Sequence, residues 1–113
     1  MIIGCDFYPL FQQIFQQTAF VDKETGECGE RRLSHPDEAE RFYRSLADRQ
    51  VLIGAEATGN FRWFRQLMHD LGHEFLLGDP SAIRAASPRR QKTDKRDARH
   101  ILNLLLEDRF PAV

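Results

Sequence analysis

Four acidic side chains stand at places where this sequence could build a reaction site. Asp6 and Glu56 each follow a short apolar run that is typical of a buried strand. Sites in layered α/β proteins form where strands end, so two neighbouring strands would bring these carboxylates to one edge of a sheet. Asp94 and Asp97, three residues apart near the start of a predicted helix, would lie about one turn apart on one helical face.

Carboxylates gathered in this way repel one another unless a counter-ion is present. Mg²⁺ and Mn²⁺ prefer hard oxygen ligands, and two such ions can stabilise the attacking and leaving oxygens of a phosphodiester displacement. The four acids therefore predict a magnesium or manganese site that supports phosphoryl transfer. A simpler interpretation keeps each acid as a structural group, with Asp94 or Asp97 capping a helix.

Positive charge is concentrated late in the chain. The whole sequence has 16 basic and 17 acidic side chains and a net charge of −1, which does not by itself indicate a nucleic-acid-binding protein. Within residues 84–99, however, the basic side chains are opposed only by Asp94 and Asp97. The basic side chains of this segment are Arg84, Arg89, Arg90, Lys92, Lys95, Arg96 and Arg99. Such a local field can hold a polyanion, so we expect these side chains to bind nucleic-acid phosphates.

The elements that must position these residues alternate in a pattern typical of layered α/β domains. Hairpins imply antiparallel pairing of the first three strands, and crossover helices imply parallel pairing of the later ones. The expected elements are strands at 2–7, 11–21 and 30–34, a helix from 34 to about 48, a strand at 51–55, a helix at 60–72, a strand at 75–78 and a last helix from 93 or 94 to 108. A repeated Phe-Gln-Gln leaves the register of the second strand open, and residues 81–91 are expected to be irregular.

Packing expectations follow from the same periodicity. Phe64 falls on the apolar face of its helix and should enter the core, with Trp63 either packed or stacked on a base. Leu104, Leu105 and Leu106 make the last helix apolar nearly all round, so we expect a further domain or a second copy to cover part of it. His100 is expected at the surface.

Length and composition exclude several classes of protein. The 113 residues suit one domain, and 42% hydrophobic with 29% charged residues is ordinary for a globular chain. No run of about eighteen apolar residues exists, so no membrane-spanning helix is expected. The first residues lack the basic region of a secretory signal, and Cys5 and Cys28 lack a metal-binding spacing. We therefore expect a cytoplasmic protein with reduced thiols.

Three short motifs, in this order, resemble those of one family. They are Ile3-Gly4-Cys5-Asp6, Glu56-Ala57-Thr58-Gly59 and Lys92-Thr93-Asp94-Lys95-Arg96-Asp97-Ala98. Together they are similar to the DEDD transposases of the insertion-sequence one-ten family, which are related to the Piv DNA invertases. The resemblance covers nearly the whole chain, including the order of its helices and strands.

This resemblance implies an α/β fold of the ribonuclease-H-like (RuvC-like) type, a mixed sheet flanked by helices. It implies that Asp6, Glu56, Asp94 and Asp97 bind Mg²⁺ or Mn²⁺ and are the catalytic acids of DNA cleavage and joining. Family members act on DNA as oligomers with a structured guide RNA. The resemblance therefore implies a homo-oligomer in the bacterial cytoplasm, associated with the nucleoid.

In that family a C-terminal domain carries a serine that attacks DNA. Residues 1–113 would correspond to the N-terminal domain alone, so this chain by itself is expected to be inactive or weakly active. The alternative is a non-catalytic nucleic-acid-binding or oligomerisation module, in which the segment 84–99 and the exposed leucines bind partners. An actin-like or sugar-kinase-like nucleotide domain fits less well, because no glycine-rich phosphate loop is present.

Overall fold

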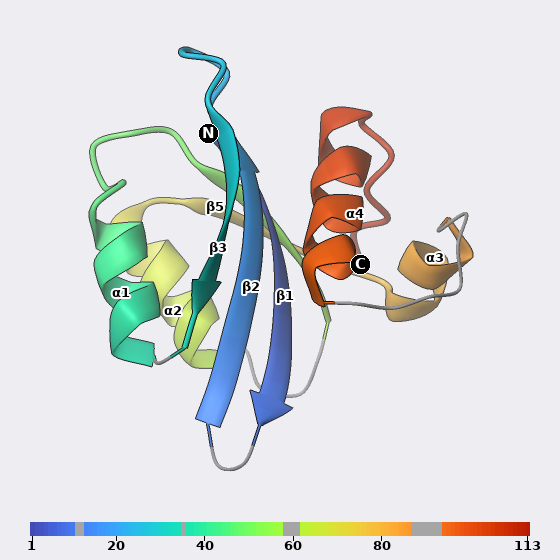
Figure 1. The fold of residues 1–113 in the computed structure, drawn as a ribbon, viewed down its shortest axis with the longest axis horizontal. Helices are drawn as coiled ribbons and strands as arrows, with labels where there is room; N and C mark the ends of the chain where they lie inside the picture. The colour runs from blue at the N-terminus through green and yellow to red at the C-terminus, as the bar shows by residue number, and fades with distance from the viewer. Residues whose placement is uncertain (11–12, 35, 58–61, 87–93) are drawn as a thin grey trace.

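The computed structural model places a five-stranded sheet between two groups of helices (Figure 1). It describes residues 1–10, 13–34, 36–57, 62–86 and 94–113, and for residues 8–10, 13–15 and 94–96 it describes the backbone alone. The elements along the described chain are β1 (Ile2–Leu10), β2 (Gln13–Val21), β3 (Cys28–Leu33), α1 (Pro36–Arg44), β4 (Leu52–Glu56), α2 (Arg62–Leu71), β5 (Glu74–Gly78), α3 (Pro80–Ala85) and α4 (Asp94–Leu106).

The sheet is mixed, with strand order β3-β2-β1-β4-β5. β1 pairs antiparallel with β2, and β2 pairs antiparallel with β3, while β4 lies parallel to both β1 and β5. These pairings confirm the predicted meander and the predicted parallel strands. The register that the sequence left open pairs Asp6 with Gln17 and Gln17 with Arg32.

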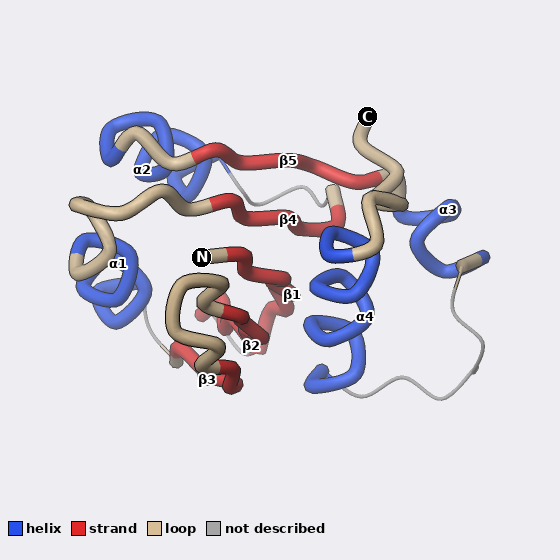
Figure 2. Tube along the Cα trace, turned by 90° about the horizontal axis from the view of Figure 1, so that it is seen from above, coloured by secondary structure: helices blue, strands red, loops and turns tan. Residues whose placement is uncertain are grey.

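Helices cover both faces of the sheet (Figure 2). α1 and α2 lie against one face, and α4 crosses the other with α3 beside it. Side chains of β1 alternate accordingly, since successive residues of a strand point to opposite faces. Ile3, Cys5 and Phe7 enter the core under α1 and α2, so Gly4 and Asp6 face α4.

Phe64 is the centre of the core on the α1 and α2 side. It is fully buried and its ring meets the rings of Phe7, Tyr43 and Phe75 at centroid distances of 4.9–5.2 Å. Trp63 packs against Phe64 edge to face, which confirms that these aromatics belong to the core. Burial of this cluster fixes β1 and β5 against the two helices.

The close approach of α4 to the sheet depends on small residues. A Cβ atom on Gly4 would lie 2.4 Å from the carbonyl oxygen of Ala98 and from the amide nitrogen of Leu102. Ala19 on β2 also packs against these two α4 residues, and Gly54 on β4 meets Leu105. Three small residues in one row across the sheet thus let the helix backbone approach the strand backbone.

The expectation that residues 81–91 are irregular was wrong for the described part of that segment. Residues 80–85 form α3, which begins at the cap Asp79, whose side chain accepts a hydrogen bond from the Ala82 amide at 3.0 Å. Pro80 occupies the first turn, where its missing N–H costs nothing. The Asp-Pro pair was therefore a usable start signal for a short helix.

α3 also overturns two packing expectations. Ile83 packs against Leu104 and Leu105 of α4, so both leucines are buried within the chain and only Leu106, 40% exposed, remains at the surface. His100, expected at the surface, is partly buried, and its Nε2 lies 2.8 Å from the carbonyl oxygen of Ile83. A further domain or a second copy is not needed to cover these leucines.

Among the helices of the described residues, none is both long enough and apolar enough to cross a bilayer.

A charged pair fastens the turn after β2 to the loop before β4. The Arg49 guanidinium donates to the carboxylate of Asp22, which is 3% exposed, and Asp22 also accepts from the Glu24 amide. The hydrogen bond from Arg49 is the main cause that holds the pKa of Asp22 below its ordinary 3.8.

We expect Asp22→Asn to lower the melting temperature by a few degrees at pH 7 and to lose this effect in acid. A depressed folded-state pKa contributes stability above the unfolded pKa and loses it as pH falls through the folded value. Melting curves of both proteins between pH 7 and pH 3 test this. A gap that stays constant down to pH 3 would contradict it, and Asp70→Asn, an exposed carboxyl on α2, is the control.

Candidate functional site

Asp6 and Glu56 come together on adjoining strands. β1 and β4 pair in parallel up to Cys5 and Ala55, so the next residue on each strand places the two acids side by side. Both face α4, because the residues two positions earlier, Gly4 and Gly54, meet that helix. Asp6 is 8% exposed and the Glu56 side chain 17% exposed, so both carboxylates are largely withdrawn from water.

The N-terminal end of α4 points in the direction of the C-terminal end of β1 (Figure 1). Ala98 lies over Gly4, two residues before Asp6, and Asp97 directly precedes Ala98. Asp97 is partly buried and makes interactions of its own. Asp94 is the first residue of α4, but its side chain lies outside the described part of the chain.

A cation already accompanies one of the acids. Arg84 of α3 places its guanidinium 3.8 Å from a carboxylate oxygen of Glu56. More than half of the Arg84 side chain is exposed, so this pair is worth little as a stabilising contact. It nevertheless supplies the positive charge that a buried carboxylate needs, and a metal ion would compete with it for Glu56.

Two further polar residues share the row of Asp6, and sequence reasoning missed them. Gln17, 3% exposed, pairs with Asp6 across β1 and β2, and Arg32 pairs with Gln17 across β2 and β3. All three side chains lie on the α4 face. The signal that could have found them is the register between β1 and β2. The Phe-Gln-Gln repeat, with a period of four residues, does not define that register.

The predicted basic residues divide into two groups. Arg84 pairs with Glu56, and Arg99 on α4 pairs with Glu30 on β3. The side chains of the other predicted phosphate-binding residues are not described, and these residues are Arg89, Arg90, Lys92, Lys95 and Arg96. Binding of phosphates by this segment stays a prediction.

The donor atoms at this place are those of a hard-cation site. Asp6 and Glu56 offer the carboxylate oxygens that Mg²⁺ and Mn²⁺ prefer, from two neighbouring strands and one face. Within the described side chains no group of three or more His, Cys, Asp or Glu is close enough to hold a metal ion. The donor chemistry thus fits a divalent cation at the two strand acids. The Asp97 side chain is described and does not form such a group with them, while the Asp94 side chain lies outside the described part of the chain.

The thiol next to Asp6 takes no part in this site. Cys5 is fully buried on the opposite face, and burial raises the pKa of its thiol well above the ordinary value, with the charge of Asp6 raising it further. A thiol held protonated in this way is a poor nucleophile and a poor metal ligand.

Comparisons with known proteins give likenesses among solved structures alone. The sequence matches no family model, and no curated protein gives a significant match. Among solved structures, the chain is similar to a chain of the cryo-electron microscopy structure of the simian T-cell lymphotropic virus intasome in complex with PP2A regulatory subunit B56 gamma, with a TM-score of 0.46 and 14% identity. The likeness covers 75% of this chain and 34% of that chain, so this chain spans about one third of its length.

Proposed function

We propose that this chain is a ribonuclease-H-like domain of a DEDD transposase and supports divalent-metal-dependent phosphoryl transfer on DNA. The observation that carries the proposal is the placement of Asp6 and Glu56 side by side, under the helix that begins at Asp94. The strand order β3-β2-β1-β4-β5, with only β2 antiparallel to the central strand β1, supports the same fold type.

Asp6 and Glu56, with Asp94 and Asp97 from α4, are the residues that would hold Mg²⁺ or Mn²⁺. A bound divalent cation would stabilise the charge that develops on the oxygens of a transferring phosphoryl group. The chain itself supplies a rigid carboxylate pair, because the strand segments that carry the two acids are fixed by packing on their other face. Asp6 lies within β1, which continues past the expected end of the strand to Leu10, and Glu56 is the last residue of β4. Partial burial of Asp6 and Glu56 strengthens their interaction with any cation, since little water screens it.

The partners in this proposal are DNA and further copies of the chain. The basic segment 84–99 would hold backbone phosphates near the acids, and a guide RNA would direct the choice of target. Complete strand exchange would need the serine domain that the resemblance implies.

Titration calorimetry with MgCl₂ and with MnCl₂ tests the metal site directly. We expect saturable binding by the wild-type chain and at least about tenfold weaker binding by Asp6→Asn, which is ~1.4 kcal/mol. Removal of one carboxylate ligand reduces both the charge and the number of oxygen donors at the site.

Asp48→Asn serves as the matched control, because Asp48 is exposed and lies in the loop before β4. It should bind both ions as the wild-type chain does. Equal binding by Asp6→Asn and wild type, or no binding by either, would refute the metal site.

The Arg84–Glu56 pair favours a second candidate, a non-catalytic nucleic-acid-binding or oligomerisation module. In that function Arg84, and not a metal ion, would permanently neutralise the charge of the Glu56 carboxylate. Arg84→Met separates the two candidates: it should tighten Mg²⁺ binding if the ion competes with Arg84. For the module, DNA binding should depend on salt, survive EDTA and be unaffected by Asp6→Asn.

A further inference from the structure

The two edges of the sheet differ in whether another segment of the chain pairs with them. At the β5 edge, Ala112 forms an antiparallel bridge with Gly78, and the amide of Val113 donates to the carbonyl oxygen of Leu77. At the other edge, no strand of the described residues pairs with the outer side of β3. An antiparallel edge strand presents alternating N–H and C=O groups outward, and these can pair with another chain.

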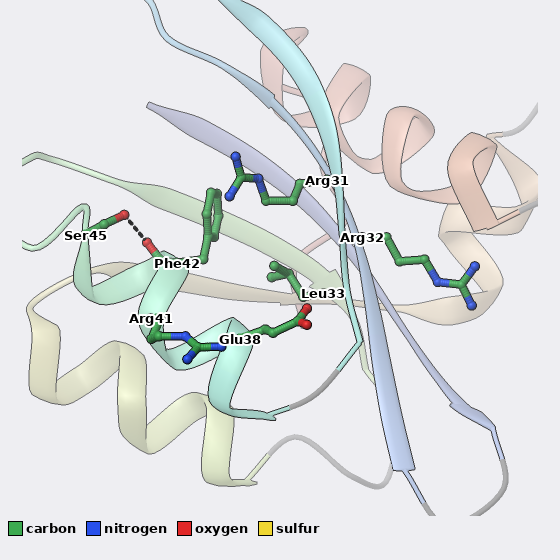
Figure 3. A pocket seen from close by; sticks show the side chains of 7 residues that line it. All are labelled: Arg31, Arg32, Leu33, Glu38, Arg41, Phe42 and Ser45. Atoms are coloured by element: carbon green, nitrogen blue, oxygen red, sulfur yellow. Dashed lines mark hydrogen bonds between the residues drawn. The ribbon is translucent and has the colours of Figure 1, made fainter.

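A groove runs along this open edge, between β3 and α1 (Figure 3). Its volume is about 590 Å³, and three consecutive β3 residues line it, so it follows the strand edge and not only the face under α1. The lining residues are Arg31, Arg32, Leu33, Glu38, Arg41, Phe42 and Ser45. Figure 3 shows Arg31 and Arg41 on the α1 side of β3, with Arg32 pointing away on the other side.

The side chains of the groove are arranged to receive an anion. The Arg31 guanidinium lies over the Phe42 ring, 5.2 Å from its centroid, which holds the group in place without neutralising it. Glu38, the acid in the groove, accepts a hydrogen bond from the Ser34 amide at the start of α1. Arg31 and Arg41 are both exposed, so the groove carries excess positive charge.

We propose that this groove binds an acidic peptide segment, which adds as a strand to the outer edge of β3. Main-chain hydrogen bonds to the edge would supply affinity, and carboxylates at alternate positions would reach Arg31 and Arg41. A peptide fits better than a nucleic-acid strand because a phosphodiester backbone carries acceptors alone. Such a backbone would leave the outward C=O groups of β3 without donors.

Fluorescence anisotropy with a labelled peptide of about ten residues, alternating Glu and Thr, tests the proposal. The wild-type chain should bind it at low salt, and Arg31→Glu and Arg41→Glu should each weaken binding by about tenfold or more. Arg44→Glu is the matched control, since Arg44 lies on α1 outside the groove and pairs with Glu40. Circular dichroism of each variant establishes that lost binding is not lost folding. Arg31→Gln removes the charge without reversing it, so it is the milder form of the same substitution.

Two further probes test the geometry. A proline in the middle of the peptide should abolish strong binding, because proline cannot donate to a strand. Peptide binding should also slow hydrogen exchange of the β3 amides. The proposal would be overturned if the Glu-Thr peptide failed to bind, or if the proline peptide bound equally well. It would also be overturned if an oligothymidylate of equal charge bound more tightly than the peptide and lost that binding in the same arginine variants. None of these results depends on Mg²⁺ or on Asp6, so they are separate from the test of the metal site.

Discussion

Replacing Gly4 by alanine is expected to lower the free energy of unfolding by about 3 kcal/mol. The added Cβ would stand 2.4 Å from the Ala98 carbonyl oxygen and 2.9 Å from the Cα of Leu102. These are backbone atoms of α4, so no side-chain rotation can relieve the overlap, and the helix must move off the sheet. A domain of this size is stable by only about 5–15 kcal/mol, so such a loss is large.

The same substitution should disturb the candidate site, because α4 carries Asp94 and Asp97. We expect Gly4→Ala to weaken Mg²⁺ binding even at temperatures where the chain is still folded. Urea unfolding and calorimetry measure the two effects separately.

Gly26→Ala is the control for this prediction. Nothing lies within 4 Å of a Cβ at Gly26, so only its positive φ of 78° opposes alanine, at a cost of about 1 kcal/mol. If Gly4→Ala unfolds at the same urea concentration as wild type, α4 does not lie against β1 as described.

The strands that carry the acids could be predicted because their signals are local. Residues 51–55 form a continuous apolar run, and the observed β4 differs from it by one residue at each end. The crossover through α2 then made parallel pairing of the flanking strands the expected arrangement. That crossover predicts the pairing of β4 with β5, whereas Asp6 and Glu56 are brought together by the pairing of β1 with β4, which the sequence could state only as a condition.

The close contact of Gly4 with Ala98 could not be predicted in the same way. The two residues lie more than ninety positions apart in the sequence, and which strand a late helix crosses depends on the assembled sheet. The motif Ile3-Gly4-Cys5-Asp6 gave the identity of the residue but no physical reason for a glycine. That reason appears only when the helix backbone is seen over it.

α3 was missed because it is only six residues long, too short for a helical periodicity to show, so that its cap Asp79 and Pro80 were its main signal. The consequence was larger than one helix, since α3 covers Leu104 and Leu105 and holds His100. The last helix was therefore expected to expose its leucines, because α3, the helix that covers them, was not predicted.

Gln17 and Arg32 were missed for a different reason. Their place beside Asp6 depends on the register of β1 with β2 and of β2 with β3. A shift of one residue would turn both side chains to the opposite face, and residues 11–21 do not alternate clearly enough to exclude that shift.

Phe64→Ala is the second substitution with a large expected effect, a loss of about 3–5 kcal/mol. The ring is fully buried and lies edge to face with four other aromatic rings, those of Phe7, Tyr43, Trp63 and Phe75. Alanine would remove most of the side-chain volume and leave a cavity that the surrounding rings cannot fill by small shifts. Each edge-to-face pair adds about 0.5–1.5 kcal/mol beyond the buried area, so the upper part of the range is expected.

The loss should extend to the candidate site through β1. Phe7 packs against Phe64 on one face of the strand, and Asp6 leaves the opposite face one residue earlier. Loosening that contact should increase hydrogen exchange at the end of β1 and weaken Mg²⁺ binding in the variant that remains folded. Phe64→Leu keeps more of the volume and should cost less than about 2 kcal/mol.

Phe42→Ala provides the matched control, since Phe42 is only partly buried and lies on α1 at the groove beside β3. It should cost about 1–2 kcal/mol and leave Mg²⁺ binding unchanged. If the two phenylalanines gave equal losses, the aromatic cluster around Phe64 would not be the centre of the core. The rigid positioning of Asp6 would then need another source. Among the described side chains, the aromatic contact that joins β1 to α2 beside Asp6 is the one between Phe7 and Phe64.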